Sequence, residues 1–373
     1  MPDVSVETSL EYVELYVTDA EASAGDFVRE YGFEVAGRLA PDAATHRSVA
    51  VRQGRILLVL TQGLADEHPA SEYVQEHGDG VAVVALRTDD AAAAYAAAVD
   101  AGASPVAAPH RPEGPAGPAV AEVAGFGGVR LAFVQHPGAP GGPAEPTARR
   151  VPLPPGLVPC DQEPPGTAQP VRLGAVDHFA VCVPAGELAA TVAFYEVALG
   201  FRMIFEERIV VGNQSMNSQV VQNARGDVTF TLIEPDTTRE AGQIDEFLKN
   251  HGGAGVQHVA FSADDIVRAV GMLRANGVEF LETPRAYYTL LPERMDLDRH
   301  GVDALMRLNI LADADHSGQL YQIFTRSRHP RRTLFMEIIE RFGAETFGSG
   351  NIKALYEAVE LDSTAPGGAR SAK

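Results

Sequence analysis

The chain is poor in several residue types, and each shortage excludes a class of protein. Its 373 residues contain no tryptophan and only two cysteines, Cys160 and Cys182, so a disulfide framework is excluded and a reducing, cytoplasmic setting is expected. No apolar run approaches the roughly 18 residues of a membrane span, and residues 1–12 lack the regions expected of a secretory signal. Basic residues are scarce as well, 30 against 50 acidic ones, and the net charge of −20 argues against nucleic acid as a partner.

What the chain does contain is an internal repeat. Residues 80–90 read GVAVVALRTDD, and residues 255–265 read GVQHVAFSADD. An earlier pair also aligns: EYVELYV from Glu11 and DHFAVCV from Asp177. Because 373 residues also exceed what one core usually supports, the sequence predicts two related domains.

The Pro- and Gly-rich stretch over residues 136–170 cannot form a helix or a central strand and is interpreted as the connection between the two halves. The expected division is an N-terminal domain without a metal site (8–138), a linker (139–173), a C-terminal catalytic domain (174–361) and a disordered tail (362–373).

Within each half the pattern strand–helix–strand–strand–strand occurs twice, which predicts an α+β fold of tandem βαβββ modules. In the second half the apolar alternation predicts strands over residues 176–183, 201–211, 218–222, 228–233, 256–262, 279–282, 319–325 and 333–339. Helices are predicted over residues 185–199 and 263–276, and a further amphipathic helix over residues 351–361.

Three potential metal ligands occur in the second half only. His178, His258 and Glu337 each lie in the middle of an apolar strand, and two curled βαβββ units would bring them together inside a cup. In the first half, Tyr12 and Val83 occupy the positions of the two histidines, and the matching last strand has no acid. Two imidazoles and one carboxylate leave coordination positions open, as non-haem Fe(II) oxygenases require. The alternative is three unrelated core residues, but a buried, unpaired Glu is costly.

Other signals are weaker. Residues 313–318 open like a calcium loop, but Phe324 stands where a bidentate Glu is required, so a hairpin turn is predicted. Cys182 shares a face with His178, and a small core thiol is the simplest interpretation. Four further histidines lie in loop-like stretches and are expected to be solvated: His251, His300, His316 and His329.

The second half resembles the 4-hydroxyphenylpyruvate dioxygenase family, two-domain members of the vicinal-oxygen-chelate superfamily. The resemblance rests on the segments VDHFAVCV, FYEVALGF, QIDEFL, GGAGVQHVAF, LYQIFTR, TLFMEIIER and FGSGNIKALYEAVE, in that order. It implies two open-barrel domains of the glyoxalase/bleomycin-resistance type and Fe(II) on the three ligands named above. It also implies a 2-oxo acid and O2 as substrates, and a homodimer or homotetramer.

The resemblance also implies which residues contact the substrate. Hydrogen-bonding positions fall on Ser218, Gln243, Gln257 and Gln322, an aromatic that stacks on the ring falls on Phe324, and Thr231, Ile233, Phe347 and Ile352 complete the expected contacts. Two positions depart from the dioxygenase pattern: Ile352 replaces a ring-contacting Phe, and Ile233 replaces a polar Asn. Both departures resemble a sister branch of the family that converts 4-hydroxyphenylpyruvate to (S)-4-hydroxymandelate for antibiotic biosynthesis.

The leading hypothesis is therefore benzylic hydroxylation to 4-hydroxymandelate, with homogentisate formation as the nearest alternative. An extradiol, ring-cleaving dioxygenase would use the same metal ligands, but it needs a further histidine near the metal, and no other histidine lies on an obvious inner strand. A non-enzymatic binding module of the same fold would leave the three ligands without a purpose.

Overall fold

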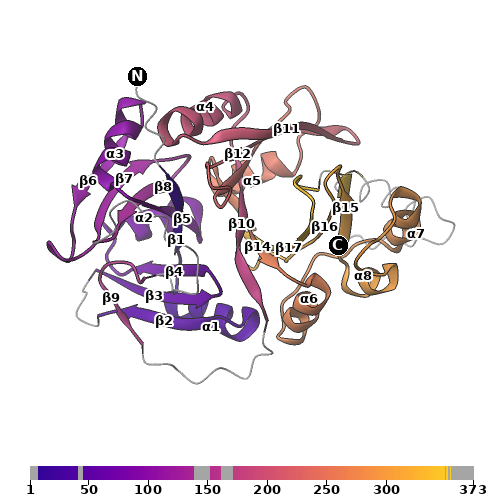
Figure 1. Cartoon of the computed structure of the whole chain (residues 1–373), viewed down its shortest axis with the longest axis horizontal. Coiled ribbons are helices and arrows are strands. Elements are labelled where there is room, and N and C mark those ends of the chain that lie inside the picture. The colour runs from indigo at the N-terminus through magenta and orange to yellow at the C-terminus, as the bar shows by residue number, and fades with distance from the viewer. Residues whose placement is uncertain are drawn as a thin grey trace.

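The computed structural model describes residues 7–40, 45–137, 152–160, 171–348, 350, 351 and 353. It contains a nine-stranded and an eight-stranded mixed sheet, one from each half of the chain. Figure 1 shows the two curled sheets side by side, the first half in indigo and magenta and the second in pink to yellow. The tandem βαβββ architecture predicted from the repeat is confirmed.

The first half contains two βαβββ units and an added strand. The first unit is β1 Thr8–Tyr16, α1 Ala20–Tyr31, β2 Glu34–Leu39, β3 His46–Gln53 and β4 Ile56–Gly63, and α2 Pro69–His77 follows it. The second unit is β5 Gly80–Thr88, α3 Ala91–Asp100, β6 Pro105–His110, β7 Ala119–Ala124 and β8 Arg130–Gln135. The strand β9 Leu157–Pro159 pairs with β2 and extends the sheet.

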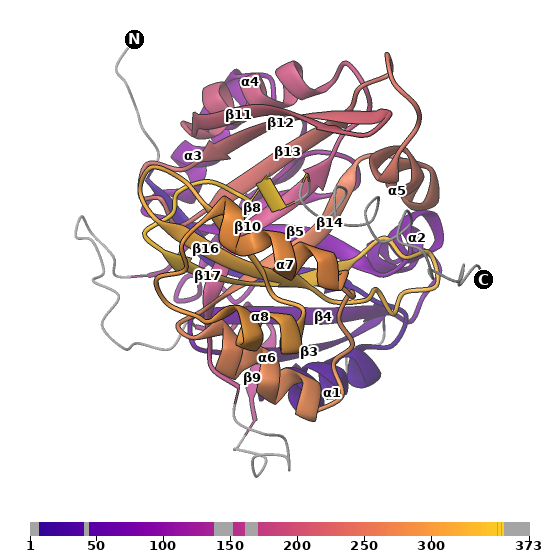
Figure 2. The ribbon, with the colours of Figure 1, turned by 90° about the vertical axis from the view of Figure 1, so that its right-hand side faces the viewer.

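The second half repeats this order with insertions. Its first unit is β10 Leu173–Cys182, α4 Leu188–Leu199, β11 Arg202–Val211, β12 Gln214–Gln222 and β13 Thr229–Pro235, followed by α5 Gln243–His251. Its second unit is β14 Gly255–Ala263, α6 Ile266–Ala275, β15 Leu311–Ala314, β16 Gln319–Phe324 and β17 Phe335–Phe342. Two helices, α7 Arg285–Arg294 and α8 Val302–Leu308, are inserted before β15 and lie in front of the sheet in Figure 2.

The second half differs from the prediction in one strand and in three helices. The strand expected over residues 279–282 is wrong, because only Phe280 makes an isolated bridge, to Thr325, and Leu281 is exposed. The first of the three strands after α6 is β15 instead. Three helices, α5, α7 and α8, were not predicted, because they are short and are stabilised by packing rather than by a long apolar repeat. The predicted hairpin turn is confirmed, since Ala314 pairs with Gln319.

Most of the expected helix over residues 351–361 lies outside the described residues, as does the expected tail over residues 362–373. Of the expected linker, residues 152–160 are described, and they include β9. No helix of the described part is long and apolar enough to cross a membrane.

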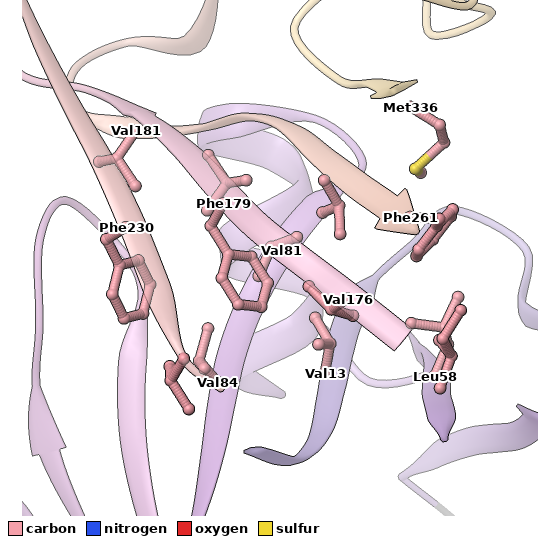
Figure 3. Close-up of a cluster of buried hydrophobic side chains, with 14 of the residues drawn as sticks. Val13, Leu58, Val81, Val84, Val176, Phe179, Val181, Phe230, Phe261 and Met336 are labelled. Atoms are coloured by element: carbon pink, nitrogen blue, oxygen red, sulfur yellow. The ribbon is translucent and has the colours of Figure 1, made fainter. Parts of the chain in front are cut away.

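The two sheets share one hydrophobic core. Figure 3 shows Val13 and Val84 of the first half beside Phe179 and Phe230 of the second, and all four belong to one buried cluster. Side chains alternate along a strand, so the odd-numbered residues Phe179 and Val181 of β10 enter this core. The pairing with β14 shifts register between Val176, which still belongs to this core, and His178. Beyond that shift, His178, Ala180 and Cys182 face away from the core, onto the inner face of their own sheet. We call the inner face of the eight-stranded sheet the second cup, and the corresponding face of the first sheet the first cup.

In the first cup, apolar side chains occupy the positions that correspond to the three expected ligands. Tyr12, Val83 and Ala132 belong to one buried cluster there, and Leu153 from the connecting segment packs against it. Strand register makes these three residues the counterparts of the expected metal ligands: Tyr12 lies opposite Ala85, as His178 lies opposite Ala260 in the second sheet. In the first half, the positions equivalent to the three expected ligands therefore belong to a hydrophobic cluster.

The prediction that the loop-region histidines are solvated is wrong for three of them. His251 is 3 % exposed at the end of α5, and its ring stacks on His77 of the first half, with 4.5 Å between centroids. His329 accepts a hydrogen bond from the backbone N–H of Asp79, and His300 contacts the carboxylate of Glu340 at 2.9 Å. His251 and His329 thus contribute to the contact between the two halves, which the sequence pattern of one half cannot show.

The buried His251 makes the stability of this contact dependent on pH. Burial, followed by the neighbouring His77, lowers the pKa of His251 from 6.5 to about 4. Between these values the unfolded chain binds more protons than the folded protein, so the free energy of unfolding falls as the pH drops. We expect this one residue to remove about 2 kcal/mol of stability between pH 7 and pH 5.

Urea unfolding at the two pH values, for wild type and His251→Phe, measures this effect. The variant should lose less stability on acidification than wild type, and His316→Phe, at an exposed position, serves as the control. Equal losses in wild type and His251→Phe would contradict the assignment.

Candidate metal centre

Three adjacent strands bring His178, His258 and Glu337 together. The sheet order places β14 between β10 and β17. His178 of β10 and Glu337 of β17 both lie opposite Ala260 of β14, and His258 precedes that alanine by two residues on the same face. The three side chains therefore converge in the second cup, as expected from the sequence.

The donor atoms are close enough to share one metal ion. One oxygen of Glu337, Oε2, lies 3.3 Å from Nε2 of His178 and 3.2 Å from Nε2 of His258. The other oxygen, Oε1, is buried without a hydrogen-bond partner in the part of the chain that the structure describes, and the residue is only 2 % exposed. A buried carboxylate in this state is costly unless a cation completes it. Two imidazoles and one carboxylate on one face fit a divalent transition metal with open coordination positions.

Neighbouring side chains fix the orientation of both imidazoles. Nδ1 of His178 lies 2.8 Å from the carboxylate of Asp177, and Nδ1 of His258 lies 3.3 Å from the amide oxygen of Gln257. An acceptor at Nδ1 keeps the proton there and leaves Nε2 free to bind a metal. Both rings thus present Nε2 toward Glu337.

The charges of the site favour an ionised carboxylate. Burial raises the pKa of Glu337, but His178 and His258 outweigh it and lower the pKa to about 2. Burial opposes protonation of His178, yet Glu337 and Asp177 raise its pKa to about 9. Burial lowers the pKa of His258. A bound cation takes the place of the proton on His178, so metal binding releases a proton.

Arg341 links the His178 side of the site to the chain that follows β17. Its guanidinium donates two hydrogen bonds of 2.9 Å to Asp177, and others to the carbonyl oxygens of Ala344 and Thr346. It also lies over the ring of Phe347, 4.8 Å from the centroid. The Phe347 ring in turn packs edge-on against His178, with 5.2 Å between centroids.

Of the residues predicted to contact the substrate, several lie in the second cup. Ser218 and Thr231 are buried in the second cup, and Ile233 lies opposite Ser218 on the adjacent strand. Gln322 is 2 % exposed. Its side-chain amide lies so close to Gly348 that a Cβ atom added there would be only 2.5 Å away, so the two residues are in close contact.

Aromatic rings flank the three side chains, whereas one predicted substrate contact, Gln243, is exposed. Phe324 and Phe335 pack on His258, with centroids at 5.7 and 4.9 Å. Gln243, by contrast, is exposed at the first position of α5. Ile352 lies outside the described residues.

Several residues of the site were missed by sequence reasoning. Asp177 and Arg341 orient His178, and Phe335 stacks on His258. The one available signal in the sequence was that Asp177 directly precedes His178. The pairing of Asp177 with Arg341 is visible only in the tertiary structure. Cys182 proves to be a buried thiol packed against Met216, as the simplest interpretation held.

A second group of potential ligands is a structural network. Asp265, His300 and Glu340 lie close together, but Glu340 already accepts from the backbone N–H of Ile266 and contacts Arg299 and His300. Its charge is therefore neutralised by protein groups, at the beginning of α6.

Fold and site together define a metalloenzyme of the vicinal-oxygen-chelate class. Residues 175–304 match the family described as the glyoxalase/bleomycin resistance protein/dioxygenase superfamily, and residues 5–139 match hydroxyphenylpyruvate dioxygenase, N-terminal. A solved triple mutant of 4-hydroxymandelate synthase from Streptomyces coelicolor is 42% identical with a TM-score of 0.82, covering 96% of this chain and 99% of that one.

Proteins named 4-hydroxyphenylpyruvate dioxygenase are similar over nearly the whole chain. The protein from Caenorhabditis elegans is 30% identical over 98% of this chain and 94% of its own length. The protein from Dictyostelium discoideum is 30% identical over 94% and 96%. The chain belongs to the 4-hydroxyphenylpyruvate dioxygenase family and is a non-haem dioxygenase.

Replacing the carboxylate that orients His178 should weaken metal binding. Asp177→Asn keeps the size of the side chain but lowers the basicity of the His178 imidazole. Loss of a carboxylate that is hydrogen-bonded to a metal-binding histidine reduces metal affinity about 10- to 100-fold. Anaerobic calorimetric titration of the apoprotein with Fe(II) measures the change. Asp264→Asn, at an exposed position, is the matched control, and equal affinities in the two variants would refute a role for Asp177.

Proposed function

We propose that the protein converts 4-hydroxyphenylpyruvate and O2 to (S)-4-hydroxymandelate and CO2. The observation that carries this proposal is Ile233, an apolar side chain on the strand beside Ser218, where the resemblance gives the dioxygenases a polar Asn. The 42% identity to 4-hydroxymandelate synthase, over 96% of the chain, supports it.

The proposed metal is Fe(II), held by His178, His258 and Glu337. Bound there, it would supply the redox chemistry, binding the 2-oxo acid and activating O2. The protein's own groups would prepare the site: Asp177 and Gln257 hold the Nδ1 protons of the two histidines. Phe324, Phe335 and Phe347 pack against the imidazoles and would help to exclude water from the reacting atoms.

The polar atoms left without partners in the second cup fit the remainder of the substrate. Thr231 Oγ1 and Gln322 Oε1 are buried and have no hydrogen-bond partner, so a substrate hydroxyl or an ordered water would satisfy them. The reaction balances: the acid loses CO2, one atom of O2 enters the new carboxylate, and the other becomes the benzylic hydroxyl. A shift of about 1 Å in ring position changes relative rates by about a hundredfold, so the cup wall selects the carbon that reacts.

Homogentisate formation is the second candidate. It uses the same substrates and metal ligands, and the relatives at 30% identity carry the name 4-hydroxyphenylpyruvate dioxygenase. The two products are isomers, which makes their mass uninformative.

Product structure decides between the two candidates. The purified protein is loaded with Fe(II) under anaerobic conditions and then given 4-hydroxyphenylpyruvate and O2, and the product is examined by NMR. We expect a benzylic CH–OH signal. A trisubstituted ring bearing a CH2 would instead establish homogentisate formation and overturn the proposal, while the absence of any product would exclude both.

The two departures from the dioxygenase pattern should control the product ratio. Ile352→Phe adds an aromatic ring, and Ile233→Asn restores a polar group beside Ser218, so each is expected to move product toward homogentisate. The NMR product ratio measures the shift, and Val210→Ile, a conservative change at an exposed position of β11, is the control. A product ratio unchanged in both variants and in their combination would remove these residues as determinants.

A further inference from the structure

The inner face of β11 carries a carboxylate that the proposed chemistry does not use. Oε2 of Glu207 is buried and has no hydrogen-bond partner among the described residues, although the residue as a whole is half-buried. The neighbouring Glu206 differs: it is exposed, and its carboxylate accepts a hydrogen bond of 3.3 Å from Gln219. A carboxylate oxygen removed from water without a donor is destabilising, so Glu207 offers an acceptor to which no described residue donates.

The flanking residues of β11 establish which way Glu207 points. Side chains alternate along the strand, so Phe205, Glu207 and Ile209 share one face. Ile209 packs against the cluster that contains Cys182, and the Phe205 ring lies 6.5 Å from the ring of Phe347. Both neighbours therefore contact the lining of the second cup, and Glu207 lies between them on the same face.

Strand register places Glu207 beside a residue already expected to contact substrate. Glu207 lies opposite Ser218, and Ser218 lies opposite Ile233 on the next strand. The row Glu207–Ser218–Ile233 crosses the wall of the second cup on strands that do not carry the metal ligands. A substrate chelated by the metal through its 2-oxo acid would extend its far end toward this wall.

The far end of 4-hydroxyphenylpyruvate is a phenol, which is a hydrogen-bond donor that remains protonated near neutral pH because its pKa is about 10. We propose that Glu207 accepts the hydrogen bond of this phenol hydroxyl and so selects para-hydroxylated 2-oxo acids. The contact would be charge-assisted, and it satisfies the oxygen that the protein leaves unpaired. This assignment rests on the proposed function, because it requires a phenolic 2-oxo acid in the second cup.

Discrimination between 4-hydroxyphenylpyruvate and phenylpyruvate, which lacks the hydroxyl, tests the proposal. The ratio of kcat/KM for the two acids is measured by O2 consumption in Fe(II)-loaded wild type, Glu207→Gln and Glu207→Ala. Anaerobic calorimetry gives the Kd of each acid. We expect Glu207→Ala to reduce the ratio at least tenfold, since a site built to hydrogen-bond a hydroxyl rejects the analogue that lacks it. Glu207→Gln, which keeps one acceptor oxygen and the shape, should fall between.

The control is Glu206→Ala, which removes the same charge from the outer face of the same strand. Its ratio should equal that of wild type, and an equal fall in both alanine variants would overturn the proposal by showing a long-range charge effect. A ratio within twofold of wild type in both Glu207 variants would overturn it as well, while leaving the proposed function intact. If wild type neither binds nor consumes either acid, the proposed function fails, and this inference fails with it.

Discussion

The site depends on one constraint: the strands that carry the three proposed metal ligands are buried on both faces. On β10, Phe179 and Val181 enter the core shared by the two sheets, and His178 faces the second cup. A slip of one residue in the register would exchange these faces and bury the imidazole in an apolar core. Hydrophobic packing between the halves thus fixes the position of a metal ligand that takes no part in that packing.

The buried carboxylate of Glu337 gives the second cup its chemical character. Two imidazoles lie against one of its oxygens, and the other has no partner. Such a group is stable only with a cation or a proton nearby. The chain then connects this centre to its surroundings through Asp177 and Arg341, whose guanidinium also holds the carbonyls of Ala344 and Thr346. The Arg341 side chain therefore couples the orientation of His178 to the position of the segment that follows β17.

Duplication explains why one half has a site and the other does not. The same strand positions hold Tyr12 and Val83 in the first half, where they pack with Leu153 of the connecting segment. A filled cup contributes stability through apolar burial, whereas a cup with open coordination positions must leave polar atoms unpaired. The first half contributes apolar burial and the second half contributes the site. The shared core can therefore stabilise a site whose polar atoms lack hydrogen-bond partners among the described residues.

Strand alternation and repeat register are local properties, so the sequence alone predicts the tandem βαβββ architecture and a cluster of three potential metal ligands in the second half but not in the first. It could not determine the short helices α5, α7 and α8, which packing stabilises, or the burial of His251 against the first half. It also could not pair Asp177 with Arg341, or show that Glu207 faces the second cup and Gln243 the solvent. Those features arise from contacts between residues far apart in the chain, which only the tertiary structure brings together.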